Sequence, residues 1–131
     1  MNLGSTLRQT LEVTGDQVEA YLALSDDQNP IHIDQGLAER FGFSGIVVPG
    51  GLIAILVGDF VHAAFKPTAI QAFKARFVHP LVLGTAIEVY SRVVKQSKQA
   101  DGCNLTIVRL KVLSDGRVIH ALFDAELSVR A

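Results

Sequence analysis

The stretch "GGLIAILVGDFVHAAF", residues 50–65, decides how the rest of the chain must be arranged. It follows Pro49 and is apolar on nearly every face except at Asp59 and His62. The apolar run stops at Asp59, short of the roughly 20 residues that a membrane-spanning helix needs, so we expect a core helix and no membrane association. A helix that is hydrophobic all round has to be covered on all sides. The remaining elements must therefore wrap around this one.

The second half of the chain supplies the cover, because four of its runs alternate between apolar and polar residues with the period of a β-strand. These runs are residues 70–78, 86–95, 105–113 and 118–129. The last is the clearest, and the sequence "SDGR" at 114–117 predicts a hairpin turn before it. Its apolar face holds Ile119, Ala121, Phe123, Ala125, Leu127 and Val129, and its polar face holds His120, Asp124, Glu126 and Ser128.

The first half predicts a strand and two short helices. Residues 3–13 alternate as a strand does. Thr14 and Gln17 have the spacing of a capping box, which predicts a helix that ends near Ser25. A second helix is expected from Asp34, as its N-cap, to Gly42. Five strands spaced about 4.8 Å apart match the roughly 23 Å length of the central helix. We therefore expect an α+β fold, a helix lying across one curved antiparallel sheet.

Length and composition restrict the function. The chain has 131 residues, 49% of them hydrophobic, and a formal net charge of -1, which fits one domain over residues 1–131. No basic run indicates a nucleic-acid or membrane partner. Cys103 is the only cysteine, and the beginning of the chain does not resemble a signal peptide, so we expect a cytoplasmic protein. A single sheet leaves one side of the helix and the strand edges open, which predicts a homodimer.

The polar stretch "DDQNPIH", residues 26–32, contains an acid and an imidazole. On a helix, Asp27 and His32 would point about 140° apart. The Asn29-Pro30 step breaks helical geometry and allows both side chains to face one water molecule. They can then act as base and acid, because an imidazole gives and accepts protons near neutral pH. Asn29 either hydrogen-bonds to the same water or braces the loop.

The start of the central helix is a candidate site for an oxyanion. Pro49 has no amide hydrogen, while the amide hydrogens of Gly50 and Gly51 are free and lie at the positive end of the helix dipole. Glycine also allows a bulky substrate to approach the backbone closely. These amides can stabilise a negatively charged oxygen that develops during a reaction.

Together these features resemble the MaoC-like dehydratase family, especially its stand-alone (R)-specific enoyl-CoA hydratases. The resemblance rests on the pattern D-x-N-P-x-H followed by an aspartate and a helix, here Asp27 to Asp34, and on a supporting F-x-x-P-L-x-x-G pattern at 77–84. It covers nearly the whole chain. It implies a hot-dog fold, in which a curved antiparallel sheet of about five strands wraps a long central helix.

The resemblance also implies an activity, namely a hydro-lyase that adds water reversibly to a trans-2-enoyl thioester and gives an (R)-3-hydroxyacyl thioester. The substrate would be carried by CoA or an acyl-carrier protein, with no cofactor and no metal. In this family the Asp and His of the motif are the catalytic pair, which corresponds to Asp27 and His32. A glycine amide at the helix start receives the thioester oxygen, which corresponds to Gly50, with Gly51 and Asn29 as further candidates for oxyanion and water positioning.

Two positions depart from the family pattern and leave other functions open. Pro49 stands where a histidine is common, although the following glycine is kept, and Gly58 replaces a serine that close relatives carry near the catalytic groups. A hot-dog acyl-CoA thioesterase would use the same kinds of groups to attack the carbonyl carbon. A non-catalytic acyl-thioester binding paralogue would have lost the chemistry and kept the pocket.

The other polar residues have structural interpretations. Asp34 fits an N-cap better than a third catalytic acid. The basic side chains of Lys74 and Arg76 share a strand face that we expect to be solvated. Four residues show no metal-ligand spacing and are expected to be structural or incidental, namely His62, His79, His120 and Cys103.

Overall fold

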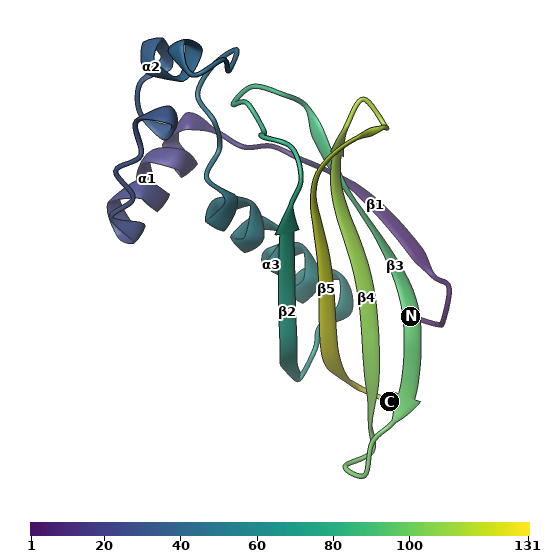
Figure 1. Cartoon of the computed structure of the whole chain (residues 1–131). Coiled ribbons are helices and arrows are strands. Elements are labelled where there is room, and N and C mark those ends of the chain that lie inside the picture. The colour runs from purple at the N-terminus through teal and green to yellow at the C-terminus, as the bar shows by residue number, and fades with distance from the viewer.

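The computed structural model describes all residues from 1 to 131, and it contains the predicted sheet and central helix (Figure 1). The sheet is antiparallel and has five strands in the order β1-β3-β4-β5-β2. The α+β prediction is confirmed. The elements in chain order are β1 (Thr6–Leu11), α1 (Gly15–Ser25), the 3-10 helix η1 (Pro30–His32), α2 (Gln35–Arg40), α3 (Gly50–Phe65), β2 (Ala69–Phe77), β3 (Ile87–Lys98), β4 (Cys103–Ser114) and β5 (Val118–Arg130).

Strands β3, β4 and β5 form a meander of neighbouring hairpins. The turn between β4 and β5 is the predicted one, since Asp115 and Gly116 both have positive φ, of 54° and 67°. Tight hairpins need positive φ at both central residues, which an aspartate and a glycine tolerate. By contrast, β1 and β2 occupy the two edges, so each has one side with no strand beside it.

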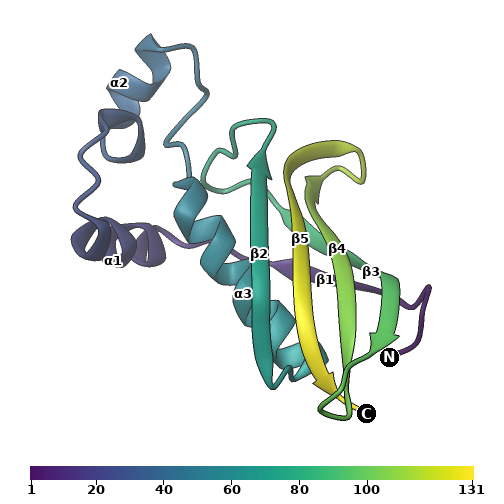
Figure 2. The same cartoon turned by 60° about the horizontal axis from the view of Figure 1, so that its bottom comes forward.

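Helix α3 packs along one face of the sheet, as Figures 1 and 2 show. Its fully buried residues Val57 and Val61 belong to the same core cluster as the alternate residues Val89 and Val93 of β3. The opposite side of α3 is not covered by this chain: Ile55 is 52% exposed, and Asp59 is exposed one turn further on. One copy of the sheet therefore covers only one side of the helix, as the sequence led us to expect.

The segment before α3 contains the predicted strand and two helices, although β1 is shorter than the predicted 3–13 and the 3-10 helix η1 was not predicted. The capping box of α1 is present, with the Thr14 side chain accepting from the Gln17 amide and the Gln17 side chain accepting in return. Asp34 caps α2 by accepting a hydrogen bond from the Leu37 amide. Figure 1 shows α1 and α2 gathered beside the beginning of α3 and away from most of the sheet. No helix combines the length and the hydropathy that a membrane span requires.

The polar face of β5 is less solvated than its sequence suggests, because His120 is only 5% exposed. The Nδ1 atom of His120 lies 3.1 Å from the carbonyl oxygen of Pro80 and 3.3 Å from that of His79. A carbonyl only accepts, so Nδ1 carries the hydrogen, and Nε2 accepts from the Ser114 hydroxyl at 2.8 Å. The buried ring of His120 thus fixes the loop that follows β2.

Candidate active site

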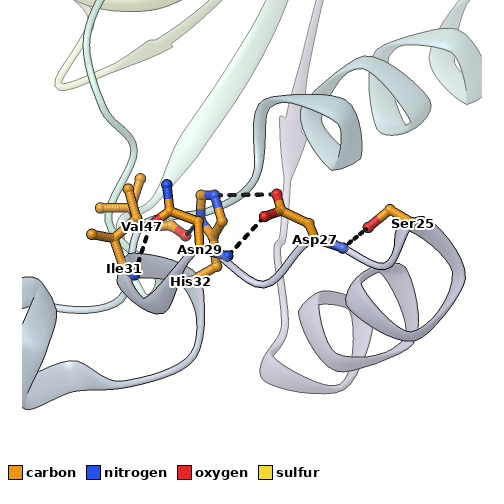
Figure 3. Close-up of polar contacts among 6 residues, drawn as sticks. All are labelled: Ser25, Asp27, Asn29, Ile31, His32 and Val47. Carbon is orange, nitrogen blue, oxygen red and sulfur yellow. Dashed lines mark hydrogen bonds and ion pairs between the residues drawn. The ribbon is translucent and has the colours of Figure 1, made fainter.

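The loop that carries the predicted acid and imidazole is braced by its own polar groups (Figure 3). The side chain of Asn29 accepts a hydrogen bond from the Ile31 amide at 3.3 Å and so caps η1. The Asn29 amide in turn donates to Oδ1 of Asp27 at 3.0 Å, and the Asp27 amide donates to the Ser25 hydroxyl at 3.3 Å. Of the two roles that the sequence left open for Asn29, these contacts support the brace.

Asp27 and His32 face each other, with 3.5 Å between Oδ2 of Asp27 and Nε2 of His32 (Figure 3). The other ring nitrogen, Nδ1, lies 2.6 Å from the carbonyl oxygen of Val47. Because a carbonyl only accepts, Nδ1 must carry a hydrogen, which leaves Nε2 as the atom that exchanges protons. A separation of 3.5 Å is long for a direct hydrogen bond. At this distance both atoms can contact one water that lies beside the pair.

The amide hydrogens of Gly50 and Gly51 have no partner in the chain. The amides of the next two residues, Leu52 and Ile53, both donate to the carbonyl of Pro49, at 3.1 and 3.3 Å. The first turn of α3 therefore presents free donors at the positive end of a 16-residue helix. Such a helix start favours a negatively charged oxygen.

A cavity of about 360 Å³ brings His32 and Gly50 together. His32 is largely shielded, with 11% of its side chain exposed, while Asp27 behind it is 35% exposed. The walls are mainly apolar, as is usual for a small-molecule site. The remaining lining residues are Ile31, Phe43, Val47, Val48, Ile53, Phe77, Val78, His79, Pro80 and Leu81.

The two glycines at the start of α3 lie in different surroundings. Gly50 faces the cavity, where a Cβ would come within 2.9 Å of the Phe77 ring. Gly51 is not part of the lining, and a Cβ there would collide with the Tyr21 hydroxyl. The cavity thus holds His32 and Gly50, while Asp27 is paired with His32 from outside the lining and Gly51 lies against α1.

The positions where the sequence departs from the family pattern do not block this arrangement. Pro49 caps α3 without a side-chain hydrogen bond, and the glycine amide after it stays free. A Cβ at Gly58 would have open space around it, so no steric reason requires glycine there. Among the apolar residues near this end of α3, Val48 and Ile53 line the cavity and Leu56 does not.

Several residues at the site carried no signal in the sequence. Val47 orients His32 through a backbone carbonyl, which any residue type possesses. Tyr21 covers Gly51 through a contact between distant parts of the chain, whereas Phe77, which covers Gly50, is the phenylalanine of the F-x-x-P-L-x-x-G pattern. His79 lines the cavity, and its position inside the F-x-x-P-L-x-x-G pattern was the only sequence feature that indicated a place near the site.

A larger cavity of about 570 Å³ lies on the sheet face opposite α3, with Tyr90, Arg92, Arg109 and Lys111 in its lining. It contains none of the candidate acid, base or oxyanion groups, so we assign the chemistry to the smaller cavity.

Two further expectations from the sequence concern basic side chains and metal ligands. Lys74 and Arg76 are exposed, as expected. No group of three His, Cys, Asp or Glu side chains is arranged to hold a metal ion.

Comparison with known proteins identifies the family of the chain. A family model described as the MaoC-like domain matches residues 3–115. A mitochondrial 3-hydroxyacyl-[acyl-carrier-protein] dehydratase of Solanum lycopersicum is 32% identical over 100 residues, covering 75% of this chain and 61% of the relative. The 3-hydroxyacyl-thioester dehydratase X of Mycobacterium tuberculosis is 31% identical over 80 residues, covering 61% of this chain and 28% of the relative.

Each of these curated relatives is thus considerably longer than the part matched here. Among solved structures, an (R)-hydratase from A. caviae involved in PHA biosynthesis superposes with a TM-score of 0.84 at 20% identity, covering 98% of this chain and 97% of that one. This likeness confirms the hot-dog fold. Since the family model extends over most of the sequence, from the first strand to the end of β4, the chain belongs to the MaoC-like domain family.

Proposed function

We propose that the chain adds water reversibly across the double bond of a trans-2-enoyl thioester and gives an (R)-3-hydroxyacyl thioester. One observation carries the proposal: the Asp27 carboxylate faces Nε2 of His32 at 3.5 Å, beside a cavity into which the start of α3 presents a free amide. Hydration needs a base, an acid and a donor for the thioester oxygen. These three groups supply them.

In the hydration direction, the Asp27 carboxylate takes a proton from a water bound beside Asp27 and His32. The water oxygen bonds to C3, and the electrons of the double bond move to the thioester oxygen. Protonated His32 then delivers its Nε2 proton to C2, the double bond to oxygen re-forms, and the proton on Asp27 passes to His32. The Val47 carbonyl holds the ring throughout, since it accepts from Nδ1 in both charge states of the imidazole.

The Gly50 amide stabilises the enolate formed between these steps. Its hydrogen is free, lies at the positive end of α3 and lines the same cavity as His32. Removing one such donor from an oxyanion site typically lowers the rate by roughly a hundredfold to a thousandfold. The close packing of the Phe77 ring on the Cα of Gly50 keeps this part of the cavity apolar, which strengthens the interaction.

The substrate is an acyl thioester carried by CoA or by an acyl-carrier protein. The names of the relatives support this class, because they describe dehydratases that act on such thioesters. The apolar cavity of about 360 Å³ suits an acyl group. A thioesterase with the same groups is the alternative function, and its product distinguishes it, because hydrolysis frees a thiol and hydration does not.

The experiment mixes the protein with a short-chain and a medium-chain trans-2-enoyl-CoA and follows the absorbance of the conjugated thioester together with free thiol. We expect the absorbance to fall without release of thiol, and chiral analysis to give the (R)-3-hydroxyacyl product. Thiol release would identify a thioesterase. Binding without either reaction, on both CoA and carrier-protein thioesters, would indicate a non-catalytic paralogue and refute the proposal.

We also propose that the chain forms a homodimer, because apolar side chains are exposed on one side of the molecule. Ile55 on the open side of α3 and Phe77 at the end of edge strand β2 are 52% and 51% exposed. Apolar side chains on an uncovered helix, beside a strand with a free edge, mark a surface that a second copy can bury. We therefore expect two copies to associate through this side, with the two cavities close to the interface.

A further inference from the structure

The cavity that holds His32 and Gly50 contains one other polar side chain, that of His79. The proposed hydration gives His79 no task. Its side chain is exposed, whereas that of His32 is only 11% exposed. His79 therefore lies nearer to solvent than His32 does. A substrate that occupies this cavity to reach His32 therefore also comes close to His79.

The ring of His79 is oriented by one strong hydrogen bond. Its Nδ1 atom lies 2.7 Å from the carbonyl oxygen of Ile119, so Nδ1 carries the hydrogen and donates it. In the neutral ring, Nε2 is then an acceptor, and no group of the chain bonds to it. An oriented ring with an unused acceptor can bind a ligand without first losing conformational freedom.

The backbone around His79 is fixed as well. The buried ring of His120 bonds to the carbonyls of His79 and Pro80, and the Val78 amide donates to the His120 carbonyl at 2.9 Å. The Ser114 hydroxyl completes the arrangement by donating to the far side of the His120 ring at 2.8 Å. The loop is thus held from the adjacent strand β5, and the position of the His79 ring is determined by the fold.

We propose that Nε2 of His79 accepts a hydrogen bond from an amide N–H of the pantetheine arm that CoA and acyl-carrier proteins share. The inference rests on the proposed function, since it takes an acyl thioester as the substrate. With the thioester oxygen at Gly50, the arm leaves through the opening and brings its amides past His79. An amide that enters an apolar opening loses bonds to water, and an acceptor placed there compensates for the loss.

The test compares two crotonyl thioesters, one of CoA and one of ethanethiol, which has no amide. His79→Ala should lower kcat/KM for crotonyl-CoA by about threefold to tenfold through KM, because one neutral hydrogen bond is lost. It should leave kcat/KM for the ethyl thioester unchanged. Val78→Ala is the matched control: it removes an apolar group from the same lining, so its effect should be equal for the two thioesters.

Three results would overturn the inference. An equal loss on both thioesters would mean that the substitution acts through the loop or the acyl group. A fall in kcat alone would give His79 a part in the chemistry. No change on crotonyl-CoA would leave it without a role in binding. A crotonyl thioester of an acyl-carrier protein tests the other carrier, and the same KM effect is expected there because the arm is the same.

Binding of saturated butyryl-CoA, measured by calorimetry, separates this inference from the proposed function. Butyryl-CoA has no double bond to hydrate, so its affinity does not depend on the reaction. His79→Ala should weaken it by the same threefold to tenfold. If the wild-type protein binds butyryl-CoA with this dependence and hydrates nothing, the function fails and the role of His79 stands. If hydration proceeds and His79→Ala leaves the affinity unchanged, only the inference fails.

Discussion

The hydroxyl of Tyr21 on α1 lies directly against the Cα of Gly51 on α3, where no Cβ could be accommodated. Gly51→Ala should therefore destabilise the protein by about 1–3 kcal/mol, the usual cost of forcing an extra carbon into a packed site. In a Tyr21→Ala background the obstacle is gone, and the same substitution should be neutral or slightly stabilising, since alanine favours helix over glycine. Urea unfolding of the four proteins measures both effects. An equal cost in the two backgrounds would contradict this explanation of the glycine.

The proposed acid/base pair predicts a large kinetic effect with little structural change. Asp27→Asn and His32→Gln should each lower the hydration rate by roughly a hundredfold to ten-thousandfold. Asparagine still accepts from the Asn29 amide, so circular dichroism of Asp27→Asn should match the wild type. The double variant should be little slower than either single one, because groups that act as a unit are not additive.

Asp26 provides the matched control for Asp27. Asp26 is the residue next to Asp27, caps α1 in the left-handed region with a φ of 56°, and forms no ion pair with His32. Asparagine tolerates this conformation, so Asp26→Asn should leave both fold and hydration rate nearly unchanged. A comparable loss of rate in the two variants would show that general charge, rather than the pair, controls the reaction.

Ser114→Ala should cost about 1–3 kcal/mol of stability, because it leaves the Nε2 atom of buried His120 without its hydrogen-bond donor. Ser97→Ala is the control, since Ser97 is exposed on β3 and its side chain makes no hydrogen bond. Thermal or denaturant unfolding compares the two. If both substitutions cost the same, the bond between Ser114 and His120 contributes nothing to stability.

A charge on the open side of α3 should prevent dimer formation. Ile55→Asp places a carboxylate one turn before Asp59 on the surface that we expect a second copy to cover, and burying unpaired charges is costly. Light scattering coupled to size exclusion should show a monomer for this variant and a dimer for the wild type. Leu24→Asp changes a residue of α1 that is still more exposed, at 89%, and should leave the dimer intact. If light scattering shows the active wild-type protein to be a monomer, the expectation of a dimer is wrong.

The parts of the fold that were predictable from sequence are those that rest on local patterns. Period-two alternation located β2 to β5, and the capping residues Thr14 and Asp34 located α1 and α2. The approach of Asp27 to His32 was also predictable, because a proline between them forces the chain out of a regular helix.

The remaining features depend on contacts between residues far apart in the chain. The burial of His120 follows from carbonyl oxygens 40 and 41 residues away, and the orientation of His32 follows from a carbonyl 15 residues away. A backbone carbonyl is present at every position, so the residue types of a sequence do not mark the one that is used. The place of His79 in the cavity lining was missed because it depends on how the loop after β2 packs against distant parts of the chain.

The strand order also determines how the chain can fold. Strands β3, β4 and β5 pair across short turns, whereas β1 pairs only with β3, through contacts such as Arg8 with Glu88, which are 80 residues apart. Closing so long a loop costs entropy that no local contact returns, so such pairings form late. During synthesis, β1 leaves the ribosome before the other strands of this sheet and must remain unpaired until β3 is made. The strand of the sheet that is synthesised earliest is thus among the last to enter it.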